Sequence, residues 1–238
     1  MRCSGLLIIM EPDRAVLLCA RRAYNLSVAN GNHFLEKISI PRGKWDSRDI
    51  FDYETAVREF IEETGTFFEN AYVYRSPFLL HWQDHGVVYR YTIYVGILKG
   101  PLRTVSRKPN TYCVKLQRNN RDSNEYQFNL QVRRHNHEIP RNLYIVPIKD
   151  YFQYMRESQL VTYDSSNYLD FFDFVEQVKI DYDSGQLNKF FTLSLRNVPI
   201  RTPAIFDSEK RVQFLGADKT AVLRVQQRHG QRNMQRQY

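Results

Sequence analysis

The chain has 238 residues, enough for one sizeable domain, or for a domain with an appendage, built around an apolar core. Its formal net charge of +8 and sequence pI near 9.4 suit a polyanionic partner such as nucleic acid, although many basic proteins bind none. No run of about 18 apolar residues occurs, so we expect no membrane span, and the N-terminal apolar stretch is too short for a signal-peptide core. The scattered cysteines lack metal-ligand spacing and predict reduced thiols in a cytoplasmic or nuclear protein.

Two apolar segments near the N-terminus predict the first strands of a sheet. Residues 5–10 (GLLIIM) and 15–21 (AVLLCAR) each suit a buried strand, and residues 11–14 (EPDR) supply the turn between them. The mixed polar segment 22–37 predicts a loop or excursion before the next element.

The segment ISIPRGK, residues 38–44, carries residues suited to a phosphate ligand. Gly43 lets the backbone approach a ligand closely, because it has no side chain. Arg42 and Lys44 would bring positive charge to a diphosphate, so we predict that both bind substrate.

Residues 52–65 (DYETAVREFIEETG) have the pattern of an amphipathic helix. Asp52 is the predicted N-cap, because its short carboxylate can accept an orphan backbone N–H. Glu54 places negative charge at the positive end of the helix dipole, and Gly65 stands where helices commonly end in a left-handed residue. The predicted apolar stripe consists of Ala56 and Phe60, with Val57 and Ile61 beside them.

Three glutamates share one side of this helix. Glu59 precedes Glu62 by three residues and Glu63 by four, so the three carboxylates are neighbours. Like charges at this spacing repel, and a hard cation such as Mg²⁺ or Mn²⁺ would remove the conflict. Arg58 would pair with Glu62 and orient a ligand rather than bind metal. The alternative is a solvated acidic face, which is the commoner meaning of a Glu-rich helix.

The central part of the chain predicts more strands and a basic segment. Two short strands are expected between residues 71 and 82, and residues 87–98 (VVYRYTIYVGIL) give the clearest strand of the chain. Further strands are predicted at 112–116 and 126–132, inside the basic segment 102–137. We expect a hairpin that contacts phosphate; the alternative is an edge hairpin whose charges prevent pairing. Its cations include Arg103, Arg107, Lys108, Lys115, Arg118 and Arg121.

The C-terminal part predicts helices and a basic tail. Residues 150–160 and 168–180 are expected to be helical, and the second has an apolar stripe suited to packing on a sheet. The apolar pieces of 186–215 either complete the core or form a cap. From 224 to 238 an arginine recurs every four residues, which predicts either a disordered tail or a helical stripe, and both could hold RNA.

Residues 43–67 resemble the signature of the Nudix hydrolases, Gly-x5-Glu-x7-Arg-Glu-apolar-x-Glu-Glu-x-Gly-apolar. The segment REFIEETG from Arg58 to Gly65 matches, but the last apolar position holds Thr66. Arg58 lies fifteen residues after Gly43, where the family has fourteen. We interpret this as a one-residue insertion before the helix, which leaves either Asp49 or Ile50 at the early Glu position.

The resemblance implies an α/β fold, the Nudix α/β/α sandwich with a mixed central sheet. We therefore expect a Nudix core over residues 1–160, with the motif at 43–67 and the basic insertion at 102–137. A helical extension over 161–238, ending in the basic tail, would pack on this core.

The resemblance also implies the roles of the site residues. Mg²⁺ or Mn²⁺ would be bound by glutamates of the motif and by one from outside it, for which Glu138 is our candidate and Glu125 the alternative. The expected metal ligands are Glu59, Glu62, Glu63 and Glu138. The expected catalytic carboxylates are Glu62, Glu63 and Glu138, and Arg58 and Gly43 would orient the ligands.

Three functions remain in competition. The IPRGK segment and the basic segments resemble Nudix mRNA-decapping enzymes, including those of large DNA viruses, which implies hydrolysis of the 5′ cap. The products would be capped nucleoside diphosphate and 5′-monophosphate RNA, and the location the cytoplasm or nucleus of a host cell. The alternative is hydrolysis of ADP-ribose or another free nucleoside diphosphate derivative. The third possibility is an RNA-binding module without catalysis, which the retained carboxylates disfavour.

Overall fold

A computed structural model describes residues 2–21, 36–120, 123–132 and 141–198. These residues belong to a unit that covers Met1–Pro199. Its mixed sheet joins twelve strands within the described ranges. They are β1 (Cys3–Met10), β2 (Arg14–Arg21), β3 (Glu36–Ser39), β4 (Arg42–Lys44), β6 (Asn70–Tyr74), β7 (Phe78–Asp84), β8 (Val87–Leu98), β10 (Tyr112–Arg118), β11 (Glu125–Val132), β12 (Arg141–Pro147), β13 (Ser165–Ser166) and β14 (Phe190–Asn197).

The main strand order is β10-β11-β14-β6-β8-β1-β2-β12. Strand β1 runs parallel to β8 and antiparallel to β2 and β4, which makes the sheet mixed. A second, two-stranded sheet pairs β5 (Thr66–Phe67) with β9 (Arg103–Thr104). The helices are α1 (Asp52–Thr64), α2 (Ile148–Tyr154) and α3 (Tyr168–Asp183), with short turns at η2 (Met155–Gln159), η3 (Leu160–Thr162) and η4 (Leu187–Lys189).

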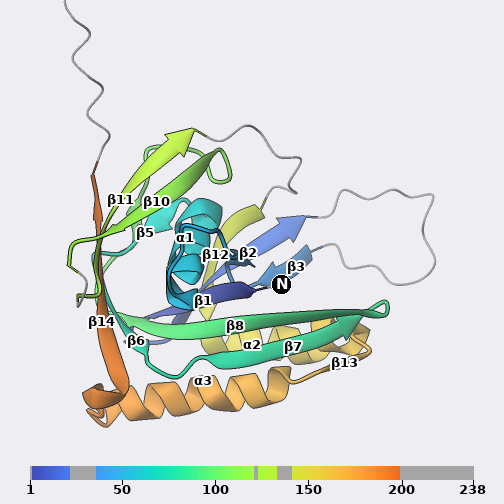
Figure 1. Cartoon of the computed structure of the whole chain (residues 1–238). Coiled ribbons are helices and arrows are strands. Elements are labelled where there is room, and N and C mark those ends of the chain that lie inside the picture. The colour runs from blue at the N-terminus through green and yellow to red at the C-terminus, as the bar shows by residue number, and fades with distance from the viewer. Residues whose placement is uncertain (1, 22–35, 121–122, 133–140, 199–238) are drawn as a thin grey trace, which may run out of the picture. The chain divides into compact units, whose positions relative to one another are not determined.

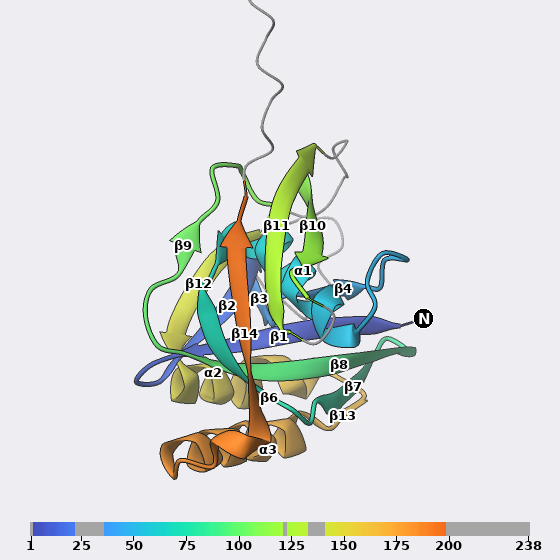
Figure 2. The ribbon, with the colours of Figure 1, turned by 60° about the vertical axis from the view of Figure 1, so that its left-hand side comes forward.

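Helices cover both faces of the sheet, as Figures 1 and 2 show. Side chains of a strand alternate between its two faces, and β1 is buried on both. Leu7 and Ile9 pack in the cluster that contains α2 and α3, whereas Leu6 and Ile8 pack in the cluster that contains α1. The predicted α/β/α sandwich with a mixed sheet is therefore confirmed.

Helix α1 occupies the predicted segment, but its N-cap differs from the prediction. Phe51 is the N-cap, and Asp52 is the first helical residue. The cap is supplied from inside the helix, because the Glu54 carboxylate accepts the backbone N–H of Ile50 at 2.6 Å and of Phe51 at 3.2 Å. Glu54 can reach back because three residues bring it over the helix start. Gly65 ends the helix with a left-handed φ of 68°, as predicted.

The hairpin and the helix α2 agree with the predictions in position and differ in extent, whereas the helical extension expected over 161–238 is wrong at residues 190–197, which form a strand. The hairpin β10–β11 forms where two short strands were expected within the basic segment. The predicted helix over 150–160 is regular only to Tyr154, and then continues as a π-helical turn and a 3₁₀ turn. Residues 190–197 form β14, which lies between β6 and β11 and so completes the sheet.

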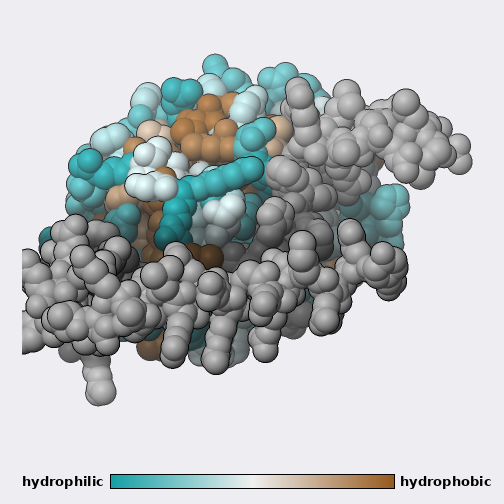
Figure 3. All heavy atoms as spheres, turned by 90° about the horizontal axis from the view of Figure 1, so that it is seen from above, coloured by the Kyte–Doolittle hydropathy of each residue, from teal (hydrophilic) through white to brown (hydrophobic). Residues whose placement is uncertain are grey.

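Some predicted segments lie outside the described residues. They include the basic tail 224–238, residues 133–137 of the basic segment, and Glu138. Within the described ranges, no helix combines the length and the apolar character that a membrane crossing needs. Seen from above, the described surface is mainly hydrophilic, with a smaller group of hydrophobic atoms among the polar ones (Figure 3).

Candidate active site

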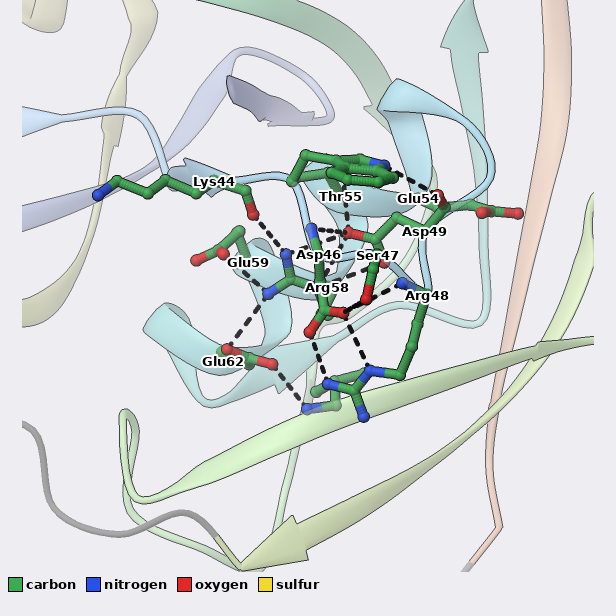
Figure 4. Close-up of polar contacts among 12 residues, drawn as sticks. Lys44, Asp46, Ser47, Arg48, Asp49, Glu54, Thr55, Arg58, Glu59 and Glu62 are labelled. Atoms are coloured by element: carbon green, nitrogen blue, oxygen red, sulfur yellow. Dashed lines mark hydrogen bonds and ion pairs between the residues drawn. The ribbon is translucent and has the colours of Figure 1, made fainter. Parts of the chain in front are cut away.

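The loop before α1 places Asp49 against Arg58. Asp49 is only 7% exposed, and its Oδ2 accepts hydrogen bonds from Arg58 Nη2 at 3.1 Å and from Thr55 Oγ1 at 2.9 Å (Figure 4). The same Arg58 nitrogen donates to the Lys44 carbonyl at 2.7 Å, which ties β4 to the helix. Ile50 is 68% exposed. Of the two positions left open by the one-residue insertion, Asp49 is therefore the one that faces Arg58.

Two of the three glutamates share the Arg58 guanidinium. Arg58 Nη1 lies 2.8 Å from Glu59 Oε1 and 3.5 Å from Glu62 Oε2, so it stands between the two carboxylates (Figure 4). Glu62 is 3% exposed, and its other oxygen accepts the backbone N–H of Val114 in β10 at 2.7 Å. Burial opposes the charge on Arg58, but the neighbouring carboxylates outweigh it and raise the pKa of Arg58 above its ordinary value.

Gly43 makes room for the Glu59 carboxylate. A Cβ added at Gly43 would lie 2.2 Å from Glu59 Cδ and 2.3 and 2.5 Å from its two oxygens. Such separations are far below van der Waals contact. Any residue with a side chain at position 43 would therefore displace Glu59, which gives this glycine a specific function in the site.

Glu63 of α1 accepts hydrogen bonds from donors on two strands, β4 and β12. Its Oε2 accepts the backbone N–H of Arg42 at 2.9 Å, and its Oε1 accepts Arg141 Nη1 at 2.8 Å. Burial raises the pKa of Glu63 to about 7, and the nearby Glu59 charge acts in the same direction. Arg141 and the Arg42 N–H oppose this shift without cancelling it. Glu63 is thus a carboxyl group that titrates near neutrality.

The Arg42 side chain lies in an aromatic stack. Its guanidinium carbon is 4.8 Å from the centre of the Trp82 ring and 4.9 Å from that of Tyr91. Arg42 thus gives its backbone N–H to Glu63 and its charge to the two ring faces. The Lys44 side chain, in contrast, is exposed and extends away from the Arg58 cluster (Figure 4).

The donor set of α1 fits a hard divalent cation in its chemistry. Carboxylate oxygens are the ligands that Mg²⁺ and Mn²⁺ prefer, Gly43 leaves room beside Glu59, and the raised pKa of Glu63 marks a buried acid that added positive charge would ionise. Arg58 and Arg141 supply positive charge to these glutamates in this structure. Within the described ranges, no three Asp, Glu, His or Cys side chains are gathered closely enough to be a formed metal cluster.

The structure locates one of the two candidates for a carboxylate from outside the motif. Glu138 lies outside the described residues. Glu125 begins β11, is exposed, and contacts Asn119 of the same hairpin through its carboxylate at 3.5 Å. Sequence reasoning missed Arg141, which is 78 residues from Glu63 and has no local motif to mark it.

The basic hairpin uses Arg118 inside the fold. The Arg118 guanidinium carbon lies 4.7 Å from the centre of the Phe51 ring, and Nη2 donates to the hydroxyls of Tyr53 at 2.6 Å and Tyr126 at 2.7 Å. Its Nη2 is also 3.4 Å from Glu54, the residue that caps α1. This cation therefore attaches the hairpin to the start of α1.

Comparison with known proteins gives baculovirus relatives, whereas no family model matches the chain. The chain is 53% identical over 213 residues to Protein ADP-ribose pyrophosphatase ORF38 of Autographa californica nuclear polyhedrosis virus, covering 88% of this chain and 98% of that protein. It is 58% identical over 195 residues to an uncharacterized 24.3 kDa protein of Orgyia pseudotsugata multicapsid polyhedrosis virus, covering 82% and 92%.

Two solved structures of Nudix hydrolases also align with the chain. One, from Nitrosomonas europaea, is 17% identical with a TM-score of 0.38 and covers 77% of this chain and 88% of its own. The other, RenU from M. smegmatis, is 23% identical with a TM-score of 0.31, covering 45% and 66%. Helix α1 carries the signature, and the two baculovirus proteins match the chain over most of their length. The chain therefore belongs to the Nudix hydrolase superfamily, in the same family as those viral proteins.

Proposed function

We propose that this protein hydrolyses the pyrophosphate linkage of ADP-ribose, or of a closely similar free nucleoside diphosphate derivative, to AMP and ribose 5-phosphate. The observation that carries the proposal is the 53% identity over 98% of a relative named ADP-ribose pyrophosphatase. The carboxylates of α1, with Gly43 beside them, support the same class of chemistry.

A divalent cation would be held at the side of α1 that carries the glutamates. Glu59 and Glu63 are the first ligands we propose, with Glu62 joining them by exchanging its contact to Arg58. When bound, Mg²⁺ or Mn²⁺ neutralises diphosphate oxygens and makes a water molecule more acidic. Glu138 remains our candidate for a further ligand or base from outside the motif.

Glu138, or a glutamate of α1 that is not bound to the cation, would accept the proton of the attacking water. The pKa of about 7 belongs to Glu63 in the metal-free protein, and a bound cation would lower it. Arg58 keeps Glu59 and Glu62 oriented, and its own position is set by Asp49 and the Lys44 carbonyl. Lys44, exposed beside this cluster, would bind a phosphate of the substrate.

Decapping, the function that the sequence pattern favours first, now ranks second. It depends on the basic segments for RNA contact, and two of those cations have partners in the fold. Arg118 contacts Tyr53 and Tyr126, and Arg103 pairs with Glu69 at 2.7 Å. A small nucleotide substrate requires neither the hairpin cations nor the C-terminal arginines.

One assay separates the candidate functions. The full chain is incubated with Mg²⁺ or Mn²⁺ and either ADP-ribose or cap-labelled RNA, beside the variants Glu62→Gln and Glu69→Gln. We expect AMP from ADP-ribose with the wild type and with Glu69→Gln, which alters a surface carboxylate paired with Arg103. Glu62→Gln should lose at least 100-fold in rate. Cap release without turnover of ADP-ribose would reverse the order, and RNA binding without any turnover would indicate the binding module.

A further inference from the structure

Among the residues that the structure describes, part of one edge of β8 has no strand partner, close to β4. The strand pairs with β7 from Val87 to Ile93, but its pairing with β1 begins only at Thr92, opposite Ser4. Residues 87–91 therefore extend past the last β1 pair on that side. In Figures 1 and 2 this part of β8 lies near the start of β1.

The hairpin register shows which backbone groups face the open edge. His85 and Gly86 form a two-residue turn with φ values of 51° and 75°, so the flanking pair Asp84–Val87 exchanges both backbone hydrogen bonds. Such pairs alternate with pairs whose N–H and C=O groups point away. Counting from Val87, the N–H and C=O groups of Val88 and Arg90 point to the open edge. Thr92, next in this series, uses the same edge to pair with β1.

A pocket of about 470 Å³ lies at this edge, lined by residues 87–91 of β8 with Cys3 and Lys44. Its volume falls in the range of small-molecule sites. Cys3 and Lys44 are partners in the β1–β4 register, and Lys44 directly follows Gly43, against which Glu59 packs. The pocket therefore borders β4 one residue beyond Gly43, at the sheet edge next to the place where Glu59 packs.

We propose that this pocket binds the adenine base of the substrate, which hydrogen-bonds to the outward N–H and C=O groups of Val88 or Arg90. This inference rests on the proposed function. Adenine carries an acceptor and a donor side by side on its edge, and each outward strand residue offers the complementary donor and acceptor. Lys44 and Arg90, both exposed, border the pocket and would meet the adjoining phosphates.

A proline tests the backbone contact without removing a ladder bond. Val88→Pro deletes an N–H that points to the open edge, a place where strands tolerate proline. Val88→Ala alters the side chain and keeps the N–H, so it should raise KM less than Val88→Pro. We expect Val88→Pro to raise KM for ADP-ribose about 5- to 50-fold, whereas the control Glu69→Gln, at a surface carboxylate paired with Arg103, stays within about 2-fold of the wild type.

A base-free substrate isolates the subsite. Hydrolysis of the 5′,5′-diphosphate of two riboses should have the same kcat/KM in the wild type and in Val88→Pro. In the unaltered protein, AMP should slow hydrogen exchange at the amides of Val88 and Arg90, which requires no variant. Equal KM for ADP-ribose in the wild type and Val88→Pro, without amide protection by AMP, would overturn the proposal while hydrolysis itself stands.

The opposite pattern separates the two proposals. If the protein hydrolyses no ADP-ribose, but AMP protects these amides and binds Val88→Pro more weakly, the adenine site stands and the proposed function fails. If Val88→Pro does not fold, the exchange experiment on the wild type decides alone. Absence of protection at both amides at saturating AMP would then refute the site.

Discussion

Gly43→Ala should disable the site while leaving the fold intact. The added Cβ would lie 2.2 Å from Glu59 Cδ, so the carboxylate must withdraw by about 1.5 Å to regain the ordinary contact distance of about 3.5–4.0 Å. Displacements of this size at catalytic groups cost about 100-fold in rate. We therefore expect kcat/KM for ADP-ribose to fall by about 100-fold, equivalent to about 2.7 kcal/mol of transition-state stabilisation.

The stability of this variant should change little. The φ of Gly43 lies outside the left-handed region, and the clashing atoms belong to the end of a flexible side chain. We expect the free energy of unfolding to stay within about 1 kcal/mol of the wild type, since alanine also reduces the freedom of the unfolded chain. Urea unfolding measures this quantity beside the kinetic assay.

A double-mutant cycle shows whether the loss acts through Glu59. Gly43→Ala and Glu59→Gln should be strongly non-additive, because both remove the same carboxylate from its place. The reasoning is wrong if Gly43→Ala retains full activity, or if its loss adds fully to that of Glu59→Gln. A large loss of stability would also contradict it, because the clash would then be with the fold rather than with the flexible acid.

Three further predictions concern the charges around α1. Asp49→Asn should lower the free energy of unfolding, measured in urea, by about 3 kcal/mol, because buried Arg58 loses a charged partner. Ile50→Ala should change it by no more than about 0.5 kcal/mol. Equal effects of the two variants would refute the assignment of Asp49, rather than Ile50, to the early Glu position. With the pKa of Glu63 raised from 4.5 to about 7, the folded metal-free protein holds a proton that the unfolded chain releases, so its unfolding free energy should fall by on the order of 3 kcal/mol as pH rises from about 4.5 to 7. Glu63→Gln should abolish that slope, and an unchanged slope would disprove the assignment. Arg141→Met removes a charge that lowers the pKa of Glu63, so the same slope should extend to higher pH, and a shift to lower pH would contradict the pairing.

The features that were predictable from the sequence are those set within a few residues. The apolar stripe of α1 and its left-handed end at Gly65 follow from local spacing and residue type. Helical spacing puts Glu59, Glu62 and Glu63 on one helix, but their carboxylates have different partners, and their shared cation remains a prediction. The strand β8 was equally clear, because β-branched and aromatic residues fill it. The N-cap was missed because Glu54 accepts the N–H groups of Ile50 and Phe51, which starts the helix one residue before the position predicted from Asp52.

The rest depended on contacts between distant segments. Arg141 contacts Glu63 from a strand 78 residues away, and no local sequence pattern at either residue predicts the pair. The contact of the Arg42 guanidinium with Trp82 and Tyr91, which come from other strands, was also not predictable, and a role of Arg42 at the diphosphate remains a prediction. Substrate choice was also not predictable, because the Nudix signature specifies the hydrolytic chemistry, whereas residues outside the signature recognise the nucleoside.

The most direct test of the account is Mn²⁺ binding to the intact protein, measured from the electron paramagnetic resonance signal of the free ion. We predict that the wild type binds Mn²⁺, that the double variant Glu59→Gln with Glu63→Gln binds it at least 100-fold more weakly, and that Glu69→Gln is unchanged. Equal Mn²⁺ binding by the wild type and the double variant would show that the glutamates of α1 do not hold the cation, and the proposed mechanism would be wrong.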